Sequence, residues 1–170
     1  AYKTRMVVNR PVDPANFNGR VVVEWFNVSG GADASPDWQH MHVELIRQGY
    51  AWVGVSAQLI GLNQLKCPAL APPACPAAGD PARYGTLVHP TDSYSYDIFS
   101  QAGQAVRDQA ALVLGGLVPE HVIAAGESQS AGRLVTYIDA AHPLVEVYDG
   151  FVVHSRGAAG AALTQTPLLA

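Results

Sequence analysis

The sequence has little charge, little cysteine and no long apolar run. Only 14% of its 170 residues are charged and the formal net charge is −4, so the basic surface that nucleic-acid-binding proteins carry is missing. None of the apolar runs reaches the length of a membrane span. The hydrophobic fraction is nevertheless 49%, which predicts a packed globular core and not a disordered chain. We expect residues 1–170 to form one domain.

The sequence contains only two cysteines, Cys67 and Cys75, in a segment rich in proline and alanine. Nothing nearby supplies further metal ligands, so we do not expect a metal site. We predict a disulfide between them, which would contribute roughly 2–3 kcal/mol by closing a short loop. Such a bond indicates an oxidising compartment, secreted or periplasmic. Two free thiols in a cytosolic loop are the alternative.

The pattern on which our interpretation depends spans residues 121–134, HVIAAGESQSAGRL. Residues 122–125 form a short apolar run typical of a strand buried on both faces of a parallel sheet. Residues 131–141 place Leu134 and Ile138 at helical spacing. Between them, Ser128 stands at the apex of a Gly-x-Ser-x-Ser turn. Strand, sharp turn and helix are the context in which G-x-S-x-G forms a nucleophile elbow.

An elbow needs small residues two positions before and two after the nucleophile, because the chain approaches itself there. Gly126 and Ser130 meet this requirement. A shifted frame would make Ser130 the nucleophile, but the apolar strand stops at Gly126 and the turn should follow at once. The simpler alternative is an ordinary helix entry with a serine cap. The helix would point its N-terminus at the site, where negative charge is stabilised.

The rest of the chain alternates strands and helices. We predict strands over residues 3–9, 21–27, 50–56 and 147–154, and helices from Pro36 and over residues 97–114. In the helix from Pro36 we expect Trp38, Met41, Leu45 and Ile46 to face the core. Residues 57–95 have little regular pattern, and we interpret them as a long loop beside the site. These elements predict an α/β fold with a mostly parallel sheet flanked by helices.

Two smaller features allow more than one interpretation. The loop VSGGADAS over residues 28–35 suits either a phosphate cradle or an oxyanion hole built from backbone N–H groups. It has neither G-x-G-x-x-G nor G-K-[ST], so the indication of nucleotide binding is weak. Glu24 lies in an otherwise apolar strand and needs a partner or a proton, and we interpret it as a structural group.

The βαβ pattern with its serine turn resembles the alpha/beta-hydrolase fold. VEWFNVSGGADASPDW (residues 23–38), GESQSAGRL (126–134) and DPARYGTLVHPTDSYSYDIFSQAG (80–103) are similar to the branch called the alpha/beta hydrolase domain family. The GES turn is also similar to that of carboxylesterases. The resemblance implies Ser128 as the nucleophile and the Gln129 N–H as one oxyanion donor. It implies a second donor at Ser29 or Val28.

In that family the catalytic acid and histidine follow the nucleophile, on strands beyond the one ending at His154. The first strand of the fold is also not found before Ala1. We therefore expect the chain to be an interior part of a longer hydrolase, whose remaining segment supplies these groups. Asp149 and His154 have the right order but lie about 16 Å apart along one strand, so they cannot form an acid–histidine pair. Only His154 or His89 could approach Ser128.

These observations favour a serine hydrolase that acts on a small carboxylic ester through an acyl-enzyme, with no cofactor. We take Glu127, His154, Arg156 and Tyr94 as candidate pocket residues. The alternative is a non-catalytic binding scaffold with a hydrolase-like fold, or an inert fragment that lacks the triad acid and histidine. A nucleotide-binding α/β domain is a second alternative, indicated only by the glycine-containing loop.

Overall fold

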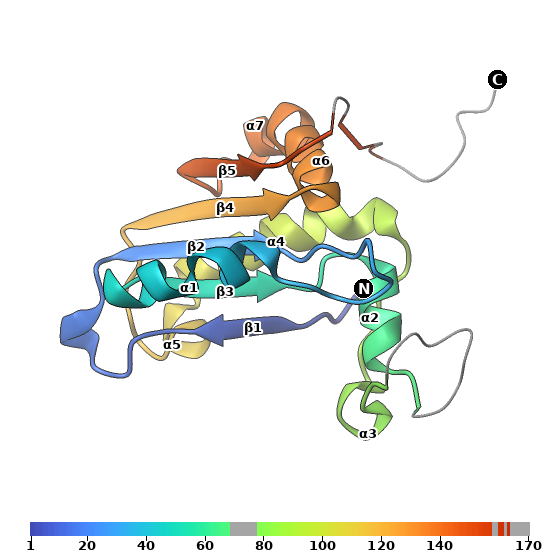
Figure 1. Cartoon of the computed structure of the whole chain (residues 1–170), viewed down its shortest axis with the longest axis horizontal. Coiled ribbons are helices and arrows are strands. Elements are labelled where there is room, and N and C mark those ends of the chain that lie inside the picture. The colour runs from blue at the N-terminus through green and yellow to red at the C-terminus, as the bar shows by residue number, and fades with distance from the viewer. Residues whose placement is uncertain (69–77, 158–159, 162, 164–170) are drawn as a thin grey trace.

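A computed structural model of the chain describes residues 1–68, 78–157, 160, 161 and 163. Five strands form one sheet in the order β1-β3-β2-β4-β5 (Figure 1). They are β1 (Met6–Asn9), β2 (Arg20–Trp25), β3 (Ala51–Val55), β4 (His121–Glu127) and β5 (Gly150–His154). β1 is antiparallel to β3, and the other neighbouring strands are parallel. The predicted α/β fold with a mostly parallel sheet is confirmed.

Helices connect the strands and cover both faces of the sheet. The main ones are α1 (Pro36–Arg47), α2 (Leu59–Leu65), α4 (Ser95–Asp108) and α6 (Gln129–Thr136). Shorter helical segments are η1 (Pro14–Asn16), α3 (Pro81–Tyr84), η2 (Asp92–Tyr94), α5 (Ala110–Val113), η3 (Tyr137–Ala141) and α7 (His142–Val145). None of the helices in the described ranges has the length and apolarity that crossing a membrane requires.

The two faces of the sheet have separate apolar cores. On the face behind the sheet in Figure 1, α4 packs Phe99 and Val106 against the β2 residues Val23 and Trp25. On the front face, α1 packs Trp38, Met41 and Leu45 against Val22, Phe26, Trp52 and Ala125. Burial of β2 on both sides explains its nearly continuous apolar sequence. This packing fixes β2 and β4 next to each other, so their carboxyl ends meet.

Several sequence predictions of local structure are wrong in detail. Residues 57–95 are not one irregular loop, because they contain α2, α3 and η2. The predicted helix over residues 97–114 is two helices, α4 and α5, interrupted at Gln109. Ile46 is 64% exposed and does not face the core.

Cys67 is buried, while Cys75 lies outside the described residues. The disulfide between them therefore stays a prediction.

Glu24 joins the centre of the sheet to the start of α1. Its side chain is fully buried. One carboxylate oxygen accepts the N–H of Asp37 at 3.0 Å. The other accepts the N–H of Trp38 and the indole N–H of Trp52, each at 2.9 Å. The carboxylate thus satisfies N–H groups that a helix N-terminus leaves unpaired, and the structural interpretation of Glu24 holds.

Glu24 is expected to make stability depend on pH. Burial raises its pKa from 4.5 to about 7, so the folded chain holds this proton more tightly than the unfolded chain. The resulting stabilisation is fully present below pH 4.5 and is lost as pH rises through about 7. The free energy of unfolding should fall by at most about 3 kcal/mol over that range. Urea denaturation from pH 5 to pH 8 at fixed ionic strength measures it.

The control is Glu24→Gln, which keeps the size of the side chain but cannot ionise. This variant should be less stable than the wild type at low pH, because one N–H donor at the start of α1 loses its acceptor. The difference should shrink as pH rises. If the free energies of unfolding of the wild type and Glu24→Gln change by the same amount between pH 5 and pH 8, Glu24 is not the source of the pH dependence.

Candidate active site

Ser128 lies between the carboxyl end of β4 and the first residue of α6. Its backbone has φ 54° and ψ −109°, a conformation that residues with a side chain rarely adopt. Ser128 is exposed, although Gly126 and Ser130, two positions before and after it, are buried. The turn is therefore sharp and strained, and it presents its apex to solvent, as the elbow interpretation predicts.

Close backbone packing explains why the turn needs glycine at position 126. A Cβ atom added to Gly126 would lie 3.0 Å from the carbonyl oxygen of Ser130 and 3.1 Å from its carbonyl carbon. The Ser128 N–H donates to the carbonyl of His154 at 2.9 Å, which joins the turn to the end of β5. The close packing of Gly126 on Ser130 and the hydrogen bond to His154 thus both hold Ser128 in its conformation.

Ser130 closes the turn and does not offer a second nucleophile. Its side chain is fully buried. The hydroxyl donates to the carbonyl of Glu127 at 2.9 Å and accepts the Glu127 N–H at 3.0 Å. The shifted frame is therefore excluded by burial. A serine at this position supplies a hydrogen bond that the glycine of the strict motif could not make.

The hydroxyl of Ser128 makes no hydrogen bond within the described part of the chain. The Gln129 N–H begins α6 and, as a first-turn amide, has no acceptor inside the helix. Both residues lie at the edge of the sheet where β4 ends. The arrangement can place an attacking hydroxyl beside a helix N-terminus that stabilises negative charge.

The loop after β2 is held against this turn by Asn27. The Asn27 side-chain N–H donates to the carbonyl of Glu127 at 2.9 Å. Backbone hydrogen bonds between Asn27 and Ala34 close the loop at its base. Val28 and Ser29 consequently lie next to the elbow, which brings together the segments from which the sequence predicts oxyanion donors.

The N–H groups of Val28 and Ser29 are both engaged by side chains. The Val28 N–H donates to Oε1 of Gln129 at 3.3 Å, and the Ser29 N–H donates to Oδ1 of Asn27 at 2.9 Å. An oxyanion is a stronger acceptor than an amide oxygen, and the bond to Val28 is longer than ordinary N–H···O distances. Replacing the side-chain oxygen by an oxyanion therefore costs less free energy at the Val28 N–H than at the Ser29 N–H. Val28 is thus the better of the two predicted donors.

A hollow of about 340 Å³ opens beside Ser128. Its lining consists of small or neutral residues: Ser128, Gln129, Gly132, Gly157, Gly160 and Ala161. The predicted pocket residues Glu127, His154, Arg156 and Tyr94 are not part of this lining. Tyr94 instead packs edge-on against Tyr2, with ring centroids 6.4 Å apart. The volume is at the lower end of the range for small-molecule sites.

The side chain of His154 is directed toward α1 and contacts an acid that sequence reasoning missed. Its Nδ1 lies 3.4 Å from Oδ1 of Asp37, a carboxylate that is 2% exposed. Burial raises the pKa of Asp37, and the nearby His154 partly offsets this effect. The ring also meets His40 edge-on. The only signal in the sequence was a carboxylate in the first turn of the helix that follows the predicted oxyanion loop.

The other acid and histidine candidates contact groups other than Ser128. Asp149 pairs with Arg107 at 2.6 Å and accepts the Val122 N–H, so it makes no pair with His154, as expected. His89 is buried, and its Nε2 lies 2.9 Å from the carbonyl of Ala57. Within residues 1–68 and 78–157, no three His, Cys, Asp or Glu side chains are arranged to hold a metal ion.

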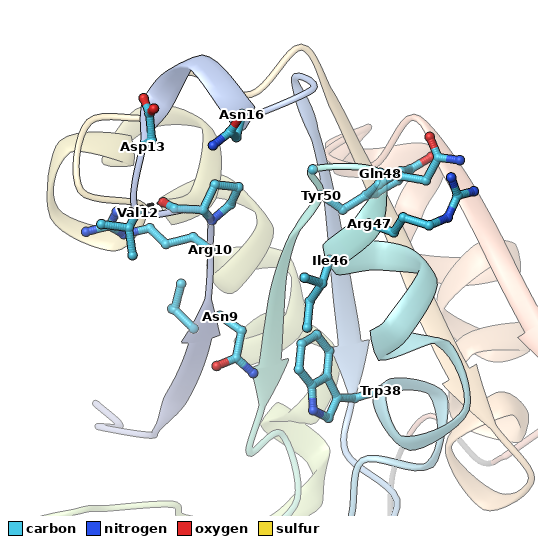
Figure 2. Close-up of a pocket in the computed structure, with 13 residues that line it drawn as sticks. Asn9, Arg10, Val12, Asp13, Asn16, Trp38, Ile46, Arg47, Gln48 and Tyr50 are labelled. Atoms are coloured by element: carbon cyan, nitrogen blue, oxygen red, sulfur yellow. Dashed lines mark hydrogen bonds between the residues drawn. The ribbon is translucent and has the colours of Figure 1, made fainter.

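A larger hollow, of about 1000 Å³, lies at the opposite end of the sheet (Figure 2). It is bordered by residues that follow β1, including Arg10, and by Gln48 and Tyr50, which precede β3. This is where the parallel strands begin, whereas Ser128 follows the end of β4. The larger hollow therefore does not belong to the site.

Residues 1–170 match the family described as "Alpha/beta hydrolase domain". A comparison with curated proteins gave no match to the chain.

Proposed function

The chain belongs to the alpha/beta hydrolase domain family, and on this premise we propose that it hydrolyses carboxylic esters with Ser128 as nucleophile. The observation that carries the proposal is the exposed, strained conformation of Ser128 at the junction of β4 and α6. Backbone strain of this kind persists only where the surrounding structure imposes it, and it concentrates at functional sites.

In the proposed reaction the Ser128 hydroxyl attacks the ester carbonyl and gives its proton to a base. The carbonyl oxygen becomes an oxyanion held by the N–H groups of Gln129 and of Val28 or Ser29. The tetrahedral intermediate expels the alcohol, which takes the proton from the base and leaves an acyl-enzyme. Water then releases the acid. We propose that the base is a histidine and that it and its acid lie outside the described residues.

The lining of the Ser128 hollow supports a small, uncharged substrate. None of its six lining residues carries a charge, so a charged acyl or alcohol group would lose hydration without gaining a partner. Glycine at positions 132, 157 and 160 leaves room beside the nucleophile. We therefore propose short-chain neutral esters as the substrate class.

Stopped-flow hydrolysis of p-nitrophenyl acetate and p-nitrophenyl butyrate by the full-length protein tests the reaction. The proposal predicts a burst of p-nitrophenol equal in amount to the enzyme, because an acyl-enzyme accumulates before water releases it. Absence of turnover with both esters, in protein shown to be folded by circular dichroism, would contradict it.

A non-catalytic scaffold is the second candidate. The Ser128 hydroxyl has no hydrogen-bond partner among the described residues, and His154 contacts Asp37 instead. A scaffold predicts no reaction of Ser128 with any acylating agent.

A nucleotide-binding role predicts a rise in melting temperature with ATP or NAD, which the ester-hydrolase proposal does not.

We also propose that the Cys67–Cys75 disulfide forms and that the protein is secreted or periplasmic. The disulfide predicts that non-reducing peptide mapping of protein from its native compartment recovers both cysteines in one linked species. Recovery of two free thiols would contradict the disulfide and remove the support for the proposed compartment.

A further inference from the structure

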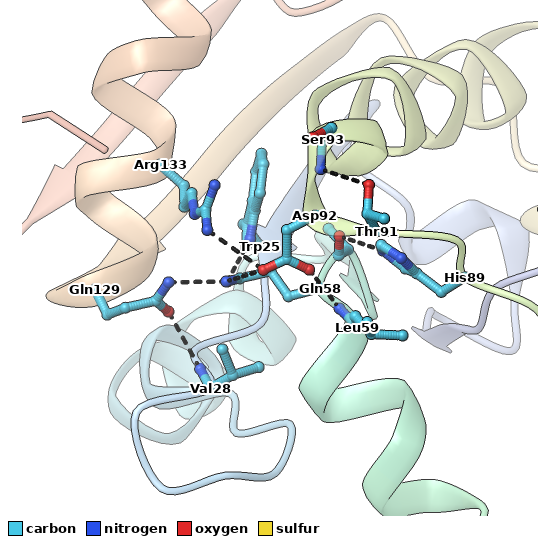
Figure 3. Close-up of polar contacts among 11 residues, drawn as sticks. Trp25, Val28, Gln58, Leu59, His89, Thr91, Asp92, Ser93, Gln129 and Arg133 are labelled. Atoms are coloured by element: carbon cyan, nitrogen blue, oxygen red, sulfur yellow. Dashed lines mark hydrogen bonds and ion pairs between the residues drawn. The ribbon is translucent and has the colours of Figure 1, made fainter. Parts of the chain in front are cut away.

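A buried glutamine connects the centre of the sheet to the proposed oxyanion site. Gln58 follows β3 and is 3% exposed. Its Oε1 accepts the indole N–H of Trp25 at 3.1 Å and the side-chain N–H of Gln129 at 3.0 Å. Its Nε2 lies 3.5 Å from a carboxylate oxygen of Asp92. Figure 3 shows these groups converging from separate segments of the chain.

The chemistry of the neighbours fixes which way both amides face. An indole N–H can only donate, so the Gln58 atom facing Trp25 must be its oxygen. The nitrogen of Gln58 then faces the carboxylate of Asp92. Because Gln129 meets the oxygen of Gln58, it must present its NH₂ group there. Its own oxygen is thereby turned to the N–H of Val28, 3.3 Å away.

Asp92 is itself held by two elements. One of its oxygens accepts the Leu59 N–H at 2.7 Å, at the start of α2. The other lies 3.3 Å from Nη2 of Arg133. Arg133 is one turn along α6 from Gln129, so two points on this helix are attached to the same group of side chains. These contacts therefore hold Gln58 firmly in place, while Gln129 lies at the edge of the candidate site.

We infer that Gln58 is a positioning residue: it holds the Gln129 amide so that the Gln129 oxygen accepts the Val28 N–H and fixes the orientation of this proposed oxyanion donor. The inference rests on the proposed function. In the resting protein the Val28 N–H donates to the neutral Gln129 oxygen. During the reaction the oxyanion, a stronger acceptor, takes the place of that oxygen. Without Gln58 the amide can turn, and the Val28 donor loses its orientation.

The test compares Gln58→Met, Gln129→Met and the double variant in the full-length protein. Each single variant should lower kcat for p-nitrophenyl butyrate by about 10-fold and change KM by less than about twofold, since the donor acts on the transition state. The double variant should be no slower than the slower single variant, because both changes break one connection. Gln101→Met, at an exposed position of α4, is the matched control.

Amide hydrogen exchange, followed by NMR, gives a readout that does not depend on activity. The Val28 N–H should exchange about 10-fold faster in Gln58→Met and in Gln129→Met than in the wild type. Unchanged exchange at Val28 in both variants overturns the inference, as does a kcat that rises. If the Val28 N–H exchanges faster in the two variants but the wild type hydrolyses no ester, the proposed function fails while Gln58 still positions Val28. If Gln58→Met does not fold, Gln129→Met carries the same comparison, because it breaks the same hydrogen bond from the other residue.

Discussion

Ser128→Ala is expected to lower kcat/KM for p-nitrophenyl esters by roughly 10³- to 10⁶-fold. The substitution removes the atom that forms the acyl bond but leaves the turn intact, because the Ser128 backbone N–H still donates to His154. Residual activity would come from the oxyanion donors and substrate binding alone. Steady-state kinetics on the full-length variant measure the loss, with melting temperature as the check on folding.

Ser130→Ala is the matched control for this prediction. It removes a hydroxyl two residues away that, among the described residues, bonds only to Glu127, so it should cost about 1 kcal/mol of stability and retain activity within about 10-fold. Ser128→Gly should be inactive but more stable than Ser128→Ala by about 1 kcal/mol, because glycine tolerates φ 54°. An active Ser128→Ala together with an inactive Ser130→Ala would reverse the assignment.

Gly126→Val is expected to impair both stability and activity. Even a single Cβ atom at this position lies 3.0 Å from the Ser130 carbonyl oxygen, and the obstacle is backbone that cannot rotate away. The first turn of α6 must shift, which should cost about 2–3 kcal/mol of stability. The same shift displaces Ser128 and the Gln129 N–H, so kcat/KM should fall by about 100-fold. Urea denaturation and ester kinetics measure the two effects.

Gly150→Val is the control, because an added Cβ there meets no atom within 4 Å. It lies at the start of β5, and its effect on stability should stay within about 0.5 kcal/mol. Gly126→Val and Gly150→Val of equal stability and activity would contradict the close approach that defines the elbow.

The sequence predicts the elbow well because its requirements are local. An apolar strand, small residues at positions 126 and 130, and a following helix lie within a few residues of Ser128. The structure confirms the strand, turn and helix in that order. The parallel sheet follows from the same logic, since short apolar runs separated by helices leave few other arrangements.

The features that the sequence does not predict depend on contacts between distant residues. Gln58 and Gln129 are 71 positions apart, and Asp37 meets His154 only because the fold brings the start of α1 to the end of β5. Residues 57–95 have little regular pattern and several prolines from Pro68 on, so the sequence predicts a loop where α2 forms. Its first N–H is capped by Asp92 from 33 residues away, and Leu62 and Leu65 pack on Leu87. Neither contact can be inferred from local spacing.

Covalent labelling of the full-length protein with a fluorophosphonate probe, followed by peptide mapping, tests the central claim most directly. The account predicts one probe per chain, attached to Ser128, and none on the Ser128→Ala variant. Labelling of another residue, or none in folded wild-type protein, would contradict it.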